Sequence, residues 1–197
     1  MPWPFLYFAG DRLSTAELTS ARLDGDVVEV GDAYMPADAI ETRELRAGSL
    51  RERVPPSLAL VRESAAWVHG AVEDAPVRHA VQRPSPVRLH HVIDARLSYS
   101  DQPLGDADTM LVSGIWVTTP ARTLADLVRA LHAGDPVAGH VDALLVWRPD
   151  LAAEACATLQ RGGSVHFKRP ALAFLRARVL ELEEAPAGQE EVTRYTS

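Results

Sequence analysis

The alternation of apolar and polar residues becomes regular near residue 14, where several helix-start signals coincide. Ser14 and Glu17 have the spacing of a capping box, and Leu13 and Leu18 occupy the two positions of a hydrophobic staple. Gly25 can end such a helix in the left-handed conformation. The pattern therefore predicts a helix between Ser14 and Gly25.

The residues after this helix have the pattern of a β-hairpin. Two short apolar runs, 27–30 and 33–35, flank the pair Gly31-Asp32, and Pro36 closes the second run. A short helix that leads into a two-stranded hairpin is the second half of a winged helix. The sequence therefore predicts a winged-helix-like segment near the N-terminus.

A second helix is predicted over 38–53, with Asp38 and Glu41 at its start. It must end before Pro55-Pro56, which is the best candidate for a domain boundary. Short apolar runs and turn residues assign the elements that follow. They are a buried strand at 58–61, a short helix at 64–70 capped by Ser64, a loop at 74–86, and two β-like runs at 87–93 and 112–117 separated by the polar residues 98–109.

The sharpest helix signal in the chain begins at Thr119. Thr119 is a good N-cap, Pro120 fits the first helical position, and apolar residues at helical spacing continue to Leu131. Arg122 and Asp126 stand four residues apart on this helix, so their side chains can pair. Taken alone, such a pair more often stabilises the fold than takes part in a reaction.

Three more helices are predicted towards the C-terminus. Two of them, 138–147 and 150–161, are separated by Pro149, and a last helix begins at Pro170 and ends near Glu184. The remaining residues, 185–197, contain few apolar side chains and are predicted to form a frayed tail.

The composition is that of an ordinary soluble protein, with 197 residues, 47% apolar side chains and a formal net charge of −7. The chain has one cysteine and no asparagine, so it offers neither an internal disulfide nor an N-glycosylation acceptor. No apolar run approaches the ~20 residues that cross a bilayer. These features predict a cytoplasmic protein of one domain, or one domain with a small appendage, and no membrane contact.

None of the candidate reactive groups forms a convincing catalytic or metal-binding pattern. Cys156 lies within an alanine-rich helix without a nearby cation, as a buried structural cysteine does. In a strand, His90-His91 would point to opposite faces, and His90 would lie ~13 Å from Asp94. Three closely spaced carboxylates precede glycine, proline or other turn residues and are better explained as turn formers. They are Asp101, Asp106 and Asp108.

Motifs that define common enzyme classes are also missing. The sequence contains no glycine-rich phosphate loop, no nucleophile elbow, and its single lysine, Lys168, does not follow an acid as a restriction-type nuclease requires. The sequence therefore predicts a protein that is not an enzyme and that uses no cofactor and no metal.

The acidic balance argues against indiscriminate binding of nucleic acid, although basic residues gather locally. One such group, near the C-terminus, contains no acidic residue. Its members are Arg161, Lys168, Arg169, Arg176 and Arg178. This predicted basic face offers a surface for an acidic partner or for RNA.

Two motifs resemble those of one protein family. Residues 114–127, GIWVTTPARTLADL, resemble the signature of the AbiEi-family antitoxins and their actinobacterial relatives, and residues 64–70, SAAWVHG, resemble a second family helix about 50 residues upstream. Residues 22–36 resemble the end of the family's winged helix. The motif residues that the resemblance singles out, in a structural or functional role, are Thr118, Thr119, Pro120, Arg122, Thr123 and Asp126.

The resemblance implies a fold and a function. It implies an α+β protein with a truncated winged-helix-like segment at 1–54, packed on an AbiEi-like C-terminal α+β domain at 55–184, and the tail at 185–197. Such antitoxins belong to type IV toxin–antitoxin pairs: the winged helix binds operator DNA, and the C-terminal domain opposes a nucleotidyltransferase toxin without a stable complex. Only about a dozen residues precede Ser14, too few for the two helices that normally come before the recognition helix, and this weakens the expectation of DNA binding.

Two functional hypotheses follow. In the first, the protein is a transcriptional regulator and antitoxin whose first helix enters the major groove of operator DNA. The residues expected to contact the DNA are Arg12, Thr15, Thr19 and Arg22. In the second, the protein keeps the family fold, has lost DNA binding, and is a scaffold for a protein or RNA partner.

Overall fold

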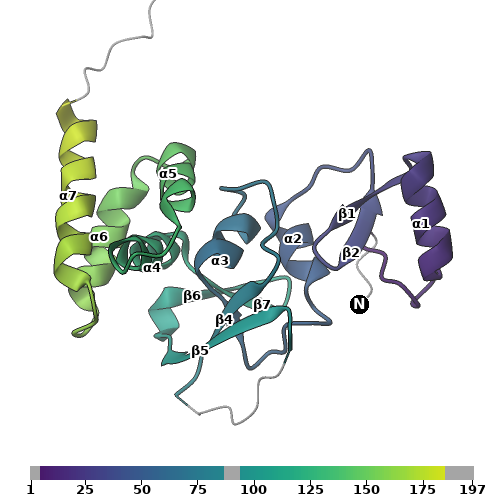
Figure 1. The fold of residues 1–197 in the computed structure, drawn as a ribbon, viewed down its shortest axis with the longest axis horizontal. Coiled ribbons are helices and arrows are strands. Elements are labelled where there is room, and N and C mark those ends of the chain that lie inside the picture. The colour runs from purple at the N-terminus through teal and green to yellow at the C-terminus, as the bar shows by residue number, and fades with distance from the viewer. Residues whose placement is uncertain (1–4, 87–93, 185–197) are drawn as a thin grey trace, which may run out of the picture.

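The computed structural model describes residues 5–86 and 94–184. Figure 1 shows an elongated molecule with α1 at one end, α7 at the other, and a sheet with α3 between them. The elements in chain order are α1 (Thr15–Asp24), β1 (Val27–Val30), β2 (Ala33–Pro36), α2 (Arg43–Ser49), β3 (Ala59–Leu60), α3 (Arg62–Val68), β4 (His79–Arg83), β5 (Leu97–Pro103), the 3-10 turn η1 (Asp106–Asp108), β6 (Thr109–Val112), β7 (Ile115–Thr118), α4 (Pro120–His132), α5 (Ala138–Trp147), α6 (Leu151–Arg161) and α7 (Lys168–Glu184). The predicted α+β class is confirmed.

The first helix follows its sequence signals closely. The Ser14 hydroxyl accepts a hydrogen bond from the backbone N–H of Glu17, whose carboxylate accepts one from the backbone N–H of Ser14, so the capping box is complete. Gly25 ends the helix at φ +82°. The helix buries only Leu18, so most of its surface faces solvent.

The predicted hairpin is also confirmed. Strands β1 and β2 pair in antiparallel register, with Val30 opposite Ala33 across the turn. Gly31 has φ +55°, and a Cβ atom there would lie 2.2 Å from the Ser49 hydroxyl oxygen of α2. Glycine is therefore required both by the backbone conformation of the turn and by the close approach of α2.

The start of the second helix was predicted wrongly. Helix α2 begins at Arg43 with Thr42 as its N-cap, whereas the segment that contains Asp38 forms a turn closed by a bond from Ala39 N–H to the Pro36 carbonyl. The helix also ends at Ser49, earlier than the predicted Arg53. A helix start is decided by which side chain reaches the free N–H groups, and here the Thr42 hydroxyl does so, 3.3 Å from the Leu45 nitrogen.

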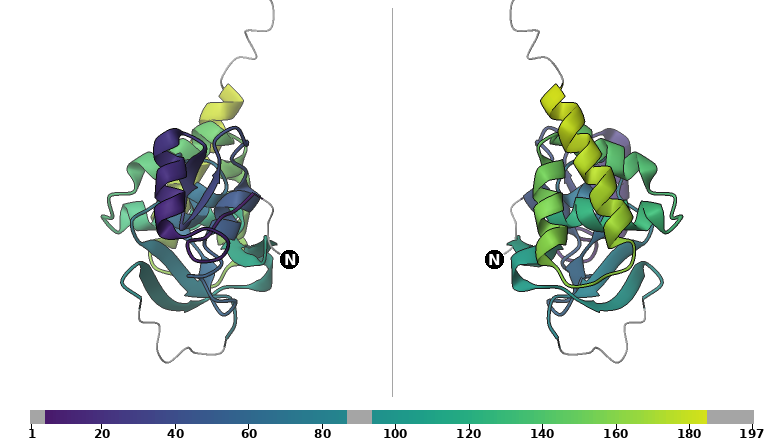
Figure 2. Two further views of the ribbon diagram at one scale, coloured as in Figure 1. Left: turned by 90° about the vertical axis from the view of Figure 1, so that its right-hand side faces the viewer. Right: turned by 90° about the vertical axis from the view of Figure 1, so that its left-hand side faces the viewer.

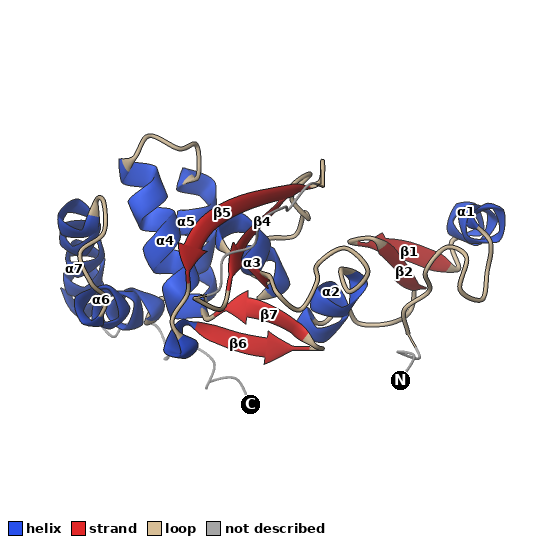
Figure 3. Ribbon diagram, turned by 90° about the horizontal axis from the view of Figure 1, so that it is seen from below, coloured by secondary structure: helices blue, strands red, loops and turns tan. Residues whose placement is uncertain are grey.

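The larger sheet has the strand order β5-β4-β3-β7-β6. The central strand β3 runs parallel to β7 and antiparallel to β4, β4 and β5 are parallel, and β6 and β7 are antiparallel. Figure 3 shows these strands from below. The apolar side chains of one sheet face, including Leu60, Val81 and Val117, lie in a core with residues of α2 and α3.

Several predictions for this sheet were wrong. The segment 74–86, predicted as a loop, contains β4. All five residues of this strand are buried, but its mixture of polar and apolar residues does not indicate burial. The polar segment 98–109 contains most of β5, whose last four residues are all exposed, so the segment resembles a loop. The run 112–117 is not one strand: it turns at Ser113-Gly114, where both residues have positive φ, so it joins β6 to β7. The run 87–93 lies outside the described residues.

Helix α3 begins at Arg62, and Ser64 is not its cap. Ser64 instead lies buried within the helix, and its hydroxyl accepts a hydrogen bond of 2.9 Å from the Ala80 N–H of β4. The serine thus joins the helix to the sheet, a role that its position beside a short apolar run did not reveal.

The C-terminal helices form a bundle beside the sheet, and Figure 2 shows α7 with α6 next to it at this end of the molecule. Helices α4, α5 and α6 occupy their predicted positions, and α7 begins at Lys168, two residues before the predicted Pro170. These helices enclose a core of their own, around Leu124, Leu127 and Leu151.

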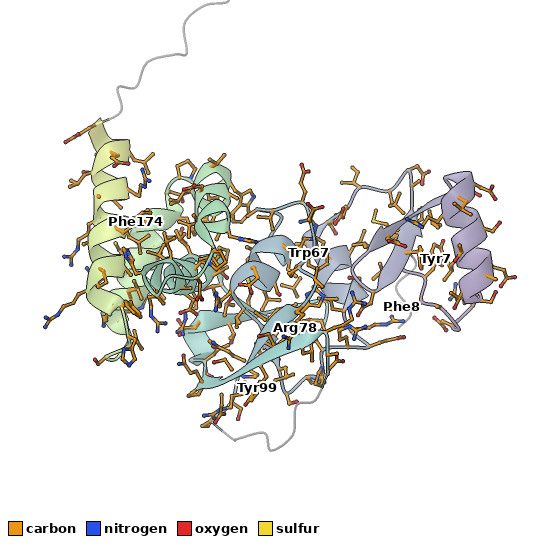
Figure 4. All side chains as sticks on the ribbon, viewed as in Figure 1. Tyr7, Phe8, Trp67, Arg78, Tyr99 and Phe174 are labelled. Carbon is orange, nitrogen blue, oxygen red and sulfur yellow. The ribbon has the colours of Figure 1, made fainter. Side chains whose placement is uncertain are left out.

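The N-terminal segment does not have a separate core. Leu6, Phe8 and Met35 belong to the same buried cluster as Leu60 and Trp67, which come from the C-terminal domain. Figure 4 shows Trp67 between the N-terminal hairpin and the C-terminal helices. The described residues therefore form a first core, shared by the hairpin and the sheet, a second core inside the helical bundle, and a smaller cluster of Ala59, Val61, Ala80 and Leu104.

Candidate functional site

The two sequence motifs, about 50 residues apart in the chain, meet in space. The Nε2–H of His69, at the end of α3, donates a 2.7 Å hydrogen bond to the Thr118 carbonyl at the end of β7. Burial lowers the pKa of His69, and the bond to Thr118 opposes that shift. The imidazole is thus a buried connector that links α3 to the β7–α4 junction.

The threonines of the second motif fasten strand β7 to helix α4. The Thr118 hydroxyl lies 2.8 Å from the Thr123 hydroxyl and 3.5 Å from the Leu60 carbonyl of β3. The Thr123 hydroxyl lies 2.9 Å from the Thr119 carbonyl, and Thr119 caps the helix by accepting from Arg122 N–H. Pro120 occupies the first turn, as predicted. The motif therefore fixes the direction in which α4 leaves the sheet.

An ion-pair network continues along α4. The Arg122 guanidinium contacts Asp126 at 2.7 Å and Asp108 of η1 at 2.6 Å, while Arg129 contacts the other Asp126 oxygen at 2.9 Å. Arg129 also donates to the His166 carbonyl in the α6–α7 loop, at 2.9 Å. Burial lowers the pKa of Arg122, but the carboxylates of Asp126 and Asp108 outweigh it and raise that pKa. The charged side chains of the motif are thus paired with one another.

Asp108 and Arg129 were not selected as site residues from the sequence. Arg129 follows Asp126 by three residues on the same helix, so helical spacing could have found it. Asp108 comes from a 3-10 turn that only the fold brings to Arg122, and its place in an Asp-rich segment suggested nothing beyond turn formation.

The four residues expected to contact DNA are all exposed at the α1 end of the molecule, as Figure 2 shows for the helix itself. The Thr19 hydroxyl donates to the Thr15 carbonyl, and Arg22 lies 3.3 Å from Glu29 on β1. Among the residues of this surface that the structure describes, the cations are Arg12 and Arg22, and Arg22 is partly neutralised by Glu29.

The five residues of the predicted basic face do not lie on one surface. At 100° per residue, Arg169 and Arg176 share a side of α7, whereas Arg178 points to the opposite side, where it pairs with Glu181 at 2.7 Å. Arg161 contacts Thr158, and Lys168 donates to the Gly162 carbonyl. Within the part of the chain that the structure describes, Arg169 and Arg176 are exposed and form no hydrogen bond or ion pair.

Other reactive groups are dispersed. Cys156 is buried, and burial raises the pKa of its thiol, which disfavours the nucleophilic thiolate form. Across residues 5–86 and 94–184, no three histidine, cysteine, aspartate or glutamate side chains gather as a metal site would require. Nor does any helix in these ranges have the length and apolar character to cross a membrane.

The sequence of this domain places it among proteins of toxin–antitoxin systems. The sequence model of the AbiEi antitoxin C-terminal domain matches residues 58–183. The chain therefore belongs to the AbiEi antitoxin family, as the two motifs predicted. The match begins two residues after Pro56, the second residue of the proline pair.

The other two comparisons add no further family assignment. The crystal structure of the RV2827C protein from Mycobacterium tuberculosis is similar to this chain, with 21% sequence identity and a TM-score of 0.31. The similarity covers 83% of this chain and 70% of the RV2827C chain. A search of curated proteins found no match.

Proposed function

We propose that the protein is a type IV antitoxin, which opposes the activity of a nucleotidyltransferase toxin without forming a stable complex with it and without catalysing a reaction. The family match over residues 58–183 carries the proposal. The ion pairs of the motif support the absence of catalysis, because Arg122 and Arg129 each bind one oxygen of Asp126 and leave neither carboxylate oxygen unpaired.

Co-expression with a nucleotidyltransferase toxin of a type IV pair tests the proposal. We expect growth to be restored when both proteins are made, while affinity purification of either one fails to recover the other. Persistent growth arrest in cells that contain the folded protein would contradict the antitoxin role. Co-purification would contradict the type IV assignment and leave the antitoxin role intact.

We further propose that α1 binds operator DNA, in the cytoplasm. The observation that favours this activity is the exposure of α1, which buries only Leu18 and presents Thr15, Thr19 and Arg22 to solvent. A helix that enters the major groove must be free in this way.

The charges around α1 predict that this binding is weak and has a small salt dependence. Arg12 and Arg22 are the cations of the surface, and Glu17, Asp24 and Glu29 lie beside them. Two phosphate contacts give a slope of about −2 for the logarithm of affinity against the logarithm of salt concentration.

Mobility shifts with the DNA upstream of the gene, across a salt series, test this activity. We expect binding at low salt that is lost when Arg12 and Arg22 are both changed to alanine, and retained when Arg148, at a distance from α1, is changed. Absence of binding by the unchanged protein at low salt would reject the proposal.

The second hypothesis, a protein or RNA scaffold, then rests on Arg169 and Arg176, the exposed cations that share one side of α7. Charge reversal at Arg176 should abolish capture of an acidic partner while the helical content stays unchanged. Reversal at Arg178, which faces the other side of α7 beside Glu181, is the matched control.

A further inference from the structure

A cleft of about 290 Å³ lies next to the motif network, between the sheet and the end of α4. Ser98, Ser100 and Gln102 of β5 and Gln82 of β4 line its sheet side, and Arg129 and Phe167 line its opposite side. Strand alternation explains the sheet side: Gln82 stands opposite Ser100 in register, whereas Val81 points into the first core. The volume is at the lower end of the range for small-molecule sites.

Gln82 has an unmet hydrogen-bonding capacity in this cleft. Its side chain is 7% exposed, and its Oε1 atom is buried without a hydrogen-bond partner in the described chain. A buried amide oxygen without a hydrogen-bond partner destabilises the folded protein. Because this atom is buried, the Gln82 amide must rotate toward the cleft before a ligand can donate a hydrogen bond to it, and that bond would remove the cost.

The two arginines of the cleft are paired with carboxylates, of which the cleft contains three, Glu63, Asp126 and Asp135. Arg62 lies 2.8 Å from Asp135 and 3.3 Å from Glu63, and Arg129 pairs with Asp126. No cation in the cleft is left over to compensate a phosphate or carboxylate, so an anionic ligand would be repelled by the excess carboxylate. The cleft therefore suits a neutral ligand with hydrogen-bonding groups.

The backbone around the cleft holds an aromatic ring at its edge. Phe167 is 44% exposed and has φ +59°, and Arg62 has φ +51°. They are two of the three non-glycine residues with positive φ in the described chain, and both line this cleft. Strained conformations of this kind persist where the surrounding structure holds a side chain in a fixed place. A flat ring at the mouth of a polar cleft is a stacking surface.

We propose that this cleft binds a nucleobase that carries an exocyclic amino group, adenine above all. The Gln82 amide matches the hydrogen-bonding edge of adenine, since glutamine reads its N6 and N7 atoms together. Phe167 stacks on the base, as aromatic side chains do with unpaired bases. The base could come from a free nucleoside or from single-stranded RNA. The inference stands on the cleft and does not depend on the antitoxin role.

Titration of the full-length protein with adenosine, followed by ligand-observed NMR, tests the inference. We expect saturable binding of adenosine, weaker binding of uridine, and no displacement of adenosine by inorganic phosphate. A short oligoadenylate distinguishes the sources: tighter binding than adenosine identifies RNA, and equal or weaker binding identifies the free nucleoside.

The variant Gln82→Met keeps the side-chain length and removes the amide. It should weaken adenosine binding about tenfold or more, with a thermal midpoint equal to or above that of the parent protein, because an unpaired polar atom has been removed. Phe167→Ala should also weaken binding about tenfold through lost stacking. Gln160→Met, on the exposed surface of α6 and outside the cleft, is the control.

Absence of adenosine binding at millimolar concentration would overturn the inference. So would unchanged affinity in a folded Gln82→Met protein, or displacement of adenosine by phosphate.

Discussion

Arg122 is held between two carboxylates that come from different elements. Its side chain is largely buried, and so is Asp126, which is 7% exposed. Pairing inside a protein differs from pairing on the surface, because a buried charge that loses its partner keeps the cost of its desolvation. Arg122 therefore contributes more to the stability of the folded protein than an arginine in an exposed ion pair on a helix.

We expect Arg122→Met to lower the free energy of unfolding by about 2 kcal/mol, since Arg129 still compensates Asp126 in part. Urea denaturation measures the change. Arg148→Met is the matched control: Arg148 pairs with Asp150 and Glu154 at the surface, so its loss should cost less than about 1 kcal/mol. Equal effects of the two substitutions would contradict the buried network.

The two buried histidines make stability depend on pH. Burial lowers the pKa values of His69 and His79 below the ordinary value of 6.5. The unfolded chain thus binds more protons than the folded protein once the pH falls below about 6.5, and stability decreases with further acidification. Their contribution is fully present above that pH.

We expect the free energy of unfolding to be lower at pH 5.5 than at pH 7.5, and the difference to shrink in His69→Gln. Denaturation at the two pH values measures it. His132→Gln, which changes an exposed histidine, should keep the full difference. A His69→Gln protein with the same pH dependence as the parent would exclude this histidine as a cause.

At the scale of elements, the turn of the N-terminal hairpin is fixed from two directions. Gly31 needs its positive φ, and it also faces the Ser49 hydroxyl at a distance that excludes a methyl group. Gly134, at φ +94°, shares the first requirement but has open space around its Cα.

Gly31→Ala should therefore lower the thermal midpoint more than Gly134→Ala does. The Gly134 variant has only the cost of a positive φ at alanine, about 1 kcal/mol, whereas the Gly31 variant also has a steric clash with Ser49. The additional Ser49→Gly change should recover part of the loss in Gly31→Ala. Identical midpoints for the two alanine variants would show that α2 does not press on the turn.

Elements with local signals were predictable from the sequence. Helix α1 has its own capping box, the β1–β2 hairpin has its turn residues, and α4 has both a cap and a proline at its start. Strands β4 and β5 have no local signal, because β4 is buried by partners distant in the chain and most of β5 consists of exposed polar residues. Their places are set by the sheet.

The candidate site was predictable to a similar extent. The pairing of Arg122 with Asp126 follows from helical spacing, and the family could be identified from the residues around it. Three features depend on how β3, β4 and β7 are ordered in the sheet. They are the hydrogen bond between His69 and Thr118, the ion pair between Asp108 and Arg122, and the cleft beside Gln82. No periodicity in the sequence encodes that order.

At the scale of the whole molecule, the two motifs form the connection between the two cores. His69 ends the helix that belongs to the first core, and Thr118 precedes α4, which organises the second. Ala66 of α3 already lies in the second core, beside Leu124. The account therefore holds that the motif residues serve the architecture, and that both cores unfold as one unit.

Native-state hydrogen exchange of the full chain measures this most directly. We predict one common opening free energy for the slowest amides of the strands β3 and β7 and of helices α4 and α6, and two separate values in His69→Ala. Two separate values in the unchanged protein would contradict the role given to the motifs.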